Sequence, residues 1–144
     1  MKWIRMVAIA VSVLLFAVRV SAKDPVYQLS THMLDVSQGA PAADVAVALY
    51  AAEEDGSWRL VAERRTDGNG RVGDLLPLGG PNGNDGVYRL RFETEPYFAA
   101  RGLGSIYPYV EVTFRIAGDG HYHIPITMSA NGYSTYYMIL QRKR

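Results

Sequence analysis

The protein has 144 residues, a formal net charge of +1 and no cysteine. This length suits one domain, which can bury an adequate core without cross-links. The lack of cysteine excludes disulfides and thiol catalysis, and the balanced charge gives no sign of a nucleic-acid-binding surface.

The first element in chain order is a predicted export signal over residues 1–22. Two basic residues precede a continuous apolar run at 6–18, and small residues follow it, as at a signal-peptidase site. The apolar run is short for a permanent membrane anchor, although an uncleaved anchor is the alternative. Cleavage after Ala22 would remove three basic residues, lowering the formal net charge from +1 to −2. We therefore expect a periplasmic or secreted domain over residues 23–144, with no membrane attachment after cleavage.

The rest of the chain consists of short runs rich in β-branched and aromatic residues, separated by Gly, Pro, Asn and Asp. Strands are predicted over residues 26–35, 44–52, 58–65, 86–94, 107–116, 121–129 and 133–142. Turn residues at 54–56 and 67–70 separate some of these runs, and 75–85 is a predicted loop. The sequence therefore predicts an all-β, antiparallel β-sandwich of seven to eight strands.

One helix and two hairpins complete this fold. Residues 95–102 form the predicted short helix, because Pro96 suits a first helical turn and Gly102 a stop. Asp119-Gly120 and Asn131-Gly132 are hairpin signals between the last three predicted strands.

Two of the three histidines lie two residues apart in one predicted strand. Side chains at such positions share a face, so His121 and His123 point one way while Tyr122 and Ile124 point toward the core. Two adjacent imidazoles can transfer protons or bind a metal. Ordinary surface or hydrogen-bonded histidines are the simpler interpretation, since no carboxylate or cysteine stands at ligand spacing. The third histidine, His32, lies in the first predicted strand.

Arg71 follows the turn at 67–70. Its guanidinium could hold a planar, anionic, carbonyl-rich ligand through two parallel hydrogen bonds, although a solvated loop charge is the simpler interpretation. The sequence shows no motif of a serine nucleophile, no phosphate-binding glycine loop and no paired-carboxylate site.

Three groups of residues together resemble the transthyretin family. The first signature is similar to residues 32–35, 39–42 and 45–47, the second to residues 122–125, 129 and 132–136, and the family's Thr-Asp-x-x-Gly-Arg turn to residues 66–71. Together with the strand order, the resemblance covers essentially all of residues 27–136. It implies the prealbumin-like, or transthyretin-like, sandwich.

The resemblance also separates two functional branches, a hormone carrier and a 5-hydroxyisourate hydrolase of urate and purine degradation. The hydrolase branch has a His in the first strand, an Arg after the turn and a His-Tyr-His-x-Pro strand. These correspond to His32, Arg71 and residues 121–125. The carrier branch has a Lys, an acidic residue and a Thr in place of His32, Arg71 and His123. The resemblance thus implies hydrolysis of 5-hydroxyisourate to 2-oxo-4-hydroxy-4-carboxy-5-ureidoimidazoline.

Roles for the site residues follow from the same resemblance. His32 and His123 are expected to activate water and transfer protons, and Arg71 to hold the substrate and its developing negative charge. Tyr136 is expected to complete the pocket through its hydroxyl, with His32 also contacting the substrate and His121 as an accessory residue. No cofactor is expected. The implied assembly is a homotetramer, a dimer of dimers, with substrate sites in channels between subunits.

One departure from the hydrolase pattern lies at the C-terminal end. The branch usually ends Tyr-Arg-Gly-Ser, whereas here Tyr136 is followed by Tyr137, Met138 and Ile139. We expect these bulky side chains to line or narrow the channel mouth.

Two other functions remain open at this point. One is a non-enzymatic binding protein for a small aromatic ligand. The other is a metal site formed by His32, His121 and His123, whose imidazoles suit Zn²⁺ or Cu²⁺.

Overall fold

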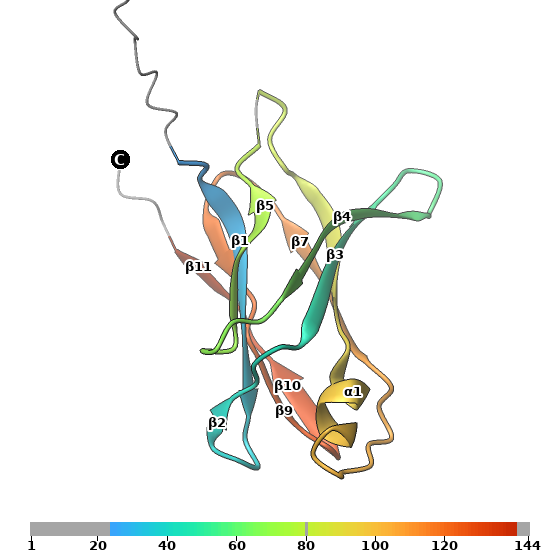
Figure 1. Ribbon diagram of the computed structural model, residues 1–144. Coiled ribbons are helices and arrows are strands. Elements are labelled where there is room, and N and C mark those ends of the chain that lie inside the picture. The colour runs from blue at the N-terminus through green and yellow to red at the C-terminus, as the bar shows by residue number, and fades with distance from the viewer. Residues whose placement is uncertain (1–23, 80, 141–144) are drawn as a thin grey trace, which may run out of the picture.

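A computed structural model describes residues 24–79 and 81–140 (Figure 1). The predicted export signal at 1–22 lies outside these residues, as do the last two positions of the predicted strand at 133–142. The elements are β1 Tyr27–Asp35, β2 Ala40–Pro41, β3 Ala46–Ala52, β4 Trp58–Arg65, β5 Arg71–Pro77, β6 Gly86–Phe92, α1 Thr94–Ala99, β7 Val110–Ile116, β8 His121–His123, β9 Ile126–Ser129, β10 Gly132–Thr135 and β11 Met138–Leu140. In the described part of the chain, no helix has the length and apolar character needed to cross a membrane.

The described strands form two sheets that face each other (Figure 1). In the seven-stranded sheet, β1 is central: β5 and β2 pair with one of its edges, and β8 and β9 with the other. β11 continues the sheet beyond β8, and β10 continues it beyond β9. The four-stranded sheet has the order β4-β3-β6-β7 and is antiparallel throughout.

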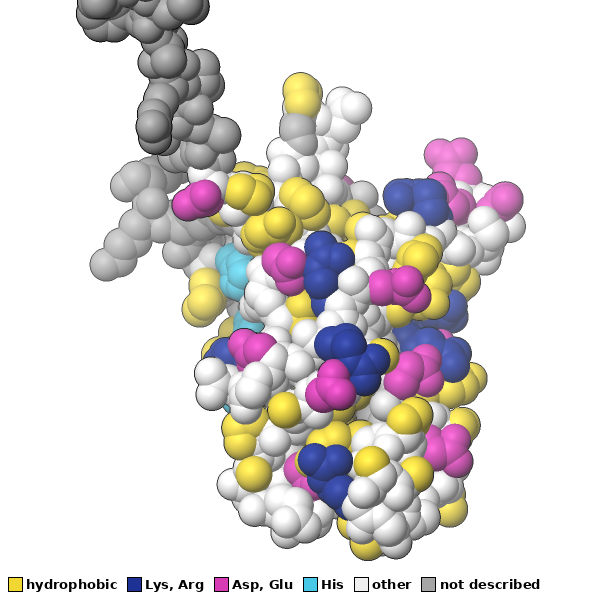
Figure 2. Space-filling model, in the orientation of Figure 1, with side chains coloured by type: hydrophobic (Ala, Val, Ile, Leu, Met, Phe, Trp, Pro, Cys, Tyr) yellow, Lys and Arg dark blue, Asp and Glu magenta, His cyan; other side chains and the backbone are white. Residues whose placement is uncertain are grey.

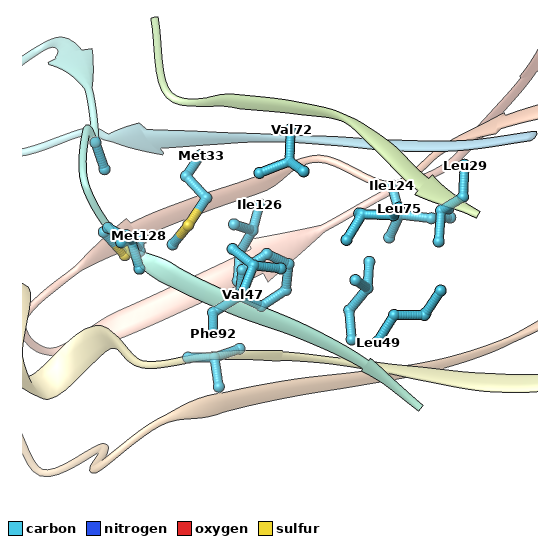
Figure 3. Close-up of a cluster of buried hydrophobic side chains, with 14 of the residues drawn as sticks. Leu29, Met33, Val47, Leu49, Val72, Leu75, Phe92, Ile124, Ile126 and Met128 are labelled. Carbon is cyan, nitrogen blue, oxygen red and sulfur yellow. The ribbon is translucent and has the colours of Figure 1, made fainter. Parts of the chain in front are cut away.

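The hydrophobic core lies between the two sheets (Figure 3). Leu29 and Met33 of β1 are fully buried there, opposite Leu49 and Phe92 of the other sheet. Burying a side chain of this size contributes roughly 1.5–3 kcal/mol. A slip of one residue would turn this apolar set away from the core, so the core fixes which face β1 presents to the outside.

The sandwich and the one short helix among the described residues confirm the predicted fold, but the described strands are more numerous and not all antiparallel. The predicted strand 121–129 is broken at Pro125, which has no N–H to continue the ladder, so β8 and β9 form instead. The predicted strand 133–142 is broken at Tyr136-Tyr137, between β10 and β11. Both β8 and β9 run parallel to β1.

Two local predictions were wrong. β5 continues through Pro77, so the loop predicted from residue 75 begins later; Leu75 and Leu76 are both buried in it. Asp119-Gly120 does not form a hairpin, because β7 and β8 belong to different sheets. The turn before Gly132 does join β9 to β10 as a hairpin.

Candidate functional site

The turn between β4 and β5 places Arg71 at the start of β5. The Asp67 carboxylate accepts hydrogen bonds from the backbone N–H groups of Asn69, at 2.8 Å, and of Arg71, at 2.9 Å. The Gly70 carbonyl accepts the N–H of Met33 at 2.8 Å, which ties the turn to β1. Gly70 has φ +72°, and a Cβ there would collide with the Met33 carbonyl oxygen. The turn predicted from sequence is therefore a fixed support for the guanidinium.

His32 lies directly opposite Arg71 in the antiparallel β1–β5 pair. Directly opposed residues share a face, and here it is the face turned away from the core. Partial burial and the positive charge of Arg71 lower the pKa of His32 below its usual 6.5, and a hydrogen bond to the Asn69 backbone and the Asp67 charge oppose this only in part. The uncharged form of the His32 ring therefore predominates at neutral pH.

His123 joins this face from the strand on the other side of β1. Its Cα pairs with that of Ser30 in the parallel β1–β8 ladder. Burial lowers the pKa of His123, and the positive charge of Arg71, together with those of His32 and His121 in their protonated forms, lowers it further. The structure thus brings His32, Arg71 and His123 together from three neighbouring strands. Figure 2 shows histidine side chains, in cyan, reaching the surface along one side of the molecule.

Ser30 connects the two histidines of β8, a role that the sequence reasoning missed. Its Oγ lies 2.8 Å from Nε2 of His121 and 2.8 Å from Nδ1 of His123. Nδ1 of His121 lies 3.1 Å from the Tyr27 carbonyl oxygen. The available signal was alternation, because Ser30 is two residues before His32 and so shares its face of β1.

The C-terminal residues border the same face. In the antiparallel β8–β11 pair, Met138 lies opposite His123 and Leu140 opposite His121. Both apolar side chains are therefore on the histidine face, and Met138 is 43% exposed. Ile139 points to the other face and contributes to a different cavity.

Tyr136 lies between β10 and β11 and is 55% exposed. It lines a cavity of about 390 Å³ at the edge of the sandwich, together with residues of β7 and β11. The described lining of that cavity includes neither Arg71 nor the histidines. The expected role of Tyr136 in the substrate pocket stays a prediction.

The three histidines do not form a metal site in the part of the chain that the structure describes, where no group of three or more His, Cys, Asp or Glu could hold a metal ion. Both ring nitrogens of His121 already have protein partners. What the face offers instead is two uncharged imidazoles beside a guanidinium. This set can accept a proton and stabilise a developing negative charge.

Comparison with known proteins gives a consistent family signal. The model of the HIUase/Transthyretin family matches residues 29–137. A probable 5-hydroxyisourate hydrolase of Caenorhabditis elegans is 41% identical over 119 residues, covering 78% of this chain and 82% of its own length. The 5-hydroxyisourate hydrolase of Salmonella typhimurium is 38% identical over 109 residues, covering 75% and 78% respectively. The structure of sea bream transthyretin in complex with thyroxine superposes with a TM-score of 0.73 at 28% identity, covering 81% of this chain and 99% of its own.

Proposed function

Because the chain belongs to the HIUase/Transthyretin family, we propose that it hydrolyses 5-hydroxyisourate, the substrate named for its relatives from Caenorhabditis elegans and Salmonella typhimurium. The observation that carries the proposal is the convergence of His32, Arg71 and His123 on one exposed sheet face.

The first step of the proposed reaction is attack by water. The substrate is a planar ring with an electrophilic carbonyl carbon. The imidazole of His32 or His123 takes one proton from water while the water oxygen bonds to that carbon. Low pKa values keep both rings able to accept this proton at neutral pH.

The second step opens the ring. The carbonyl oxygen becomes an oxyanion beside the Arg71 guanidinium, which stabilises it through charge and hydrogen bonding. When the carbonyl re-forms, the ring C–N bond breaks and the protonated imidazole gives its proton to the leaving nitrogen. The product is a ring-opened carboxylate, consistent with 2-oxo-4-hydroxy-4-carboxy-5-ureidoimidazoline.

The direct test is the ultraviolet decay of freshly generated 5-hydroxyisourate with and without residues 23–144. We expect decay far faster than the spontaneous rate, and loss of that acceleration in His123→Ala. A folded protein that leaves the spontaneous rate unchanged would refute the proposal.

We also propose that the active assembly is a homotetramer, a dimer of dimers, with the site between subunits. Arg71 and the histidines lie on an open sheet face, so another surface is needed to enclose a substrate there. The exposed apolar side chains of β11 and the positions of β7 and β11 as the last strands of their sheets offer surfaces for such contacts. Sedimentation equilibrium should give four times the monomer mass; a monomer that still turns over would contradict this assembly.

A binding protein for a small aromatic ligand is the second candidate. The observation that favours it is Met138, an apolar side chain beside His123 on the site face. The sea bream neighbour is described in complex with thyroxine. Calorimetric binding of an aromatic ligand without turnover of 5-hydroxyisourate would support this function instead.

Export is the last part of the proposal. Residues 1–22 have the composition of a cleavable signal, and the family match begins after them, at residue 29. N-terminal sequencing of protein recovered from the periplasm or culture medium should begin at Lys23. Recovery of an uncleaved chain from membranes would support the anchor instead.

A further inference from the structure

We propose that Ser30 and His121 are positioning residues that hold the His123 ring with its hydrogen on Nδ1 and its electron pair on Nε2, and that His123 is therefore the base that activates water. The assignment of His123 as base rests on the proposed function; the ring orientation and tautomer do not.

The assignment begins at the Tyr27 carbonyl, which can only accept a hydrogen bond. Because Nδ1 of His121 lies 3.1 Å from this oxygen, that nitrogen carries the hydrogen. In the uncharged form of the imidazole only one nitrogen carries a hydrogen, so in that form Nε2 of His121 is an acceptor.

Ser30 passes this polarity to His123. Its hydroxyl has one hydrogen, which it donates to Nε2 of His121 across 2.8 Å. The Ser30 oxygen then accepts from Nδ1 of His123, also across 2.8 Å. The remaining His123 nitrogen, Nε2, holds an electron pair and is not engaged by Ser30. A base needs this arrangement.

The same chain supports His123 after it has accepted a proton. Water gives its proton to Nε2, and both ring nitrogens then carry hydrogen. The Nδ1 hydrogen still has the Ser30 oxygen as acceptor, so the imidazolium loses no partner. Ser30 thus orients His123 and stabilises its imidazolium form without accepting the proton itself.

Two further hydrogen bonds between β1 and the residue after β8 hold Ser30 and the two histidines in place. The Ser30 carbonyl accepts the Ile124 N–H at 3.0 Å, and the Thr31 hydroxyl donates to the Ile124 carbonyl at 2.7 Å. Thr31 is buried, so this second contact is shielded from water. These hydrogen bonds oppose any shift of β8 along β1, which would separate Ser30 from His121 and His123.

The first experiment is nitrogen-15 NMR of protein labelled at histidine, at about pH 8, where ordinary histidines are uncharged. Protonated and unprotonated ring nitrogens have well-separated shifts. We expect a protonated Nδ1 and an unprotonated Nε2 for His123, and mixed tautomers in Ser30→Ala. A protonated Nε2 in the wild-type protein would overturn the proposal. This readout does not depend on turnover, so it separates failure of this inference from failure of the proposed function.

The second experiment is kinetic. Ser30→Ala should lower kcat by about 10- to 100-fold, part of what a general base contributes, with KM changed by less than about twofold. Ser30→Thr keeps the hydroxyl in a strand that tolerates β-branched residues and should restore most of the rate. Ser57→Ala, in a turn of the other sheet, is the matched control and should leave kcat unchanged.

Whether Ser30 positions His123 or only supports the fold is tested by comparing Ser30→Ala in the wild-type protein with Ser30→Ala in His123→Ala. There Ser30→Ala should cause no further loss of the residual rate, because the residue it orients is already gone. An equal loss in both backgrounds would show that Ser30 acts only on the fold and would overturn the proposal. His121→Ala should follow Ser30→Ala in kcat and in the His123 tautomer; an unchanged tautomer would remove His121 from the chain.

Discussion

The two margins of the histidine face are built in opposite ways. At the β5 margin, Arg71 stands on a turn fixed by the Asp67 carboxylate and by Gly70, whose carbonyl is bound to β1. At the β11 margin, three consecutive residues, Met138–Leu140, are all exposed in this chain. The contrast teaches that the charge-bearing side of the site is set by local turn chemistry, whereas the apolar side depends on what packs against it.

The largest expected effects test the chemical side. Arg71→Ala removes the group proposed to stabilise the oxyanion and should lower kcat/KM about 10²- to 10³-fold. His123→Ala removes the proposed base and should cost about 10²- to 10⁴-fold. Both are measured by 5-hydroxyisourate decay. Arg59→Ala is the matched control, since that guanidinium pairs with Glu53 at the surface of the other sheet. Near-wild-type rates in both site variants would invalidate the site.

Rigidity of the turn is tested by Gly70→Ala. The positive φ and the collision with the Met33 carbonyl should lower the free energy of unfolding by about 3 kcal/mol, measured by urea denaturation. Gly68→Ala in the same turn is the control, because its Cβ would meet no atom within 4 Å. If the two variants were equally stable, the turn would not be the fixed margin that we describe.

The pH dependence of the rate tests the electrostatics of the face. The pKa of His123 is lowered by burial and by the nearby Arg71, His32 and His121, so kcat/KM should begin to fall only at a lower pH than it would with an ordinary histidine as the base. Below its lowered pKa the base becomes protonated, and the rate should fall by up to about tenfold per pH unit.

The same shifts predict a change in stability with pH. In the folded protein the pKa values of His32 and His123 are both lower than the usual 6.5 of a histidine, so the unfolded chain binds protons more readily. The two histidines therefore lower the free energy of unfolding most at low pH. This destabilisation vanishes above pH 6.5. Urea titrations across this range should show stability rising with pH. A kcat/KM that increases as the pH falls below 6.5 would contradict both the lowered pKa of His123 and its assignment as the base.

The smallest expected effect concerns the apolar margin. Met138→Ala should raise kcat/KM by no more than about tenfold, because a shortened side chain beside His123 widens access without touching the charged groups. Leu60→Ala, also an exposed apolar residue but in β4, is the control. A loss of activity as large as that of Arg71→Ala would mean that this margin belongs to the chemistry after all.

Alternation made much of the site predictable. Period-2 spacing places His121 and His123 on one face and the buried Tyr122 and Ile124 on the other, as the structure shows. Turn chemistry likewise identified residues 67–70 as the segment before Arg71. Both signals are local, so neighbouring residues suffice to read them.

Long-range pairing was beyond the reach of these local signals. Leu75 and Leu76 are consecutive and both buried, because the β1–β5 ladder has register shifts that break the alternation. Alternation therefore does not identify this end of β5 as a strand. Asp119-Gly120 has hairpin composition but crosses between sheets. Ser30 carries no motif; its importance exists only because β8 lies beside β1.

That parallel pairing also sets a timetable for assembly. The two contacts of Ser30 join residues 91 and 93 positions apart, so the site belongs to the high-contact-order part of the fold. At translation rates of about 5–20 residues per second, β1 leaves the ribosome about 5–20 s before β8. During that interval one edge of β1 has no native partner and is open to pairing with other chains. A chaperone that holds the chain unfolded until synthesis ends would therefore protect the strand on which the site depends.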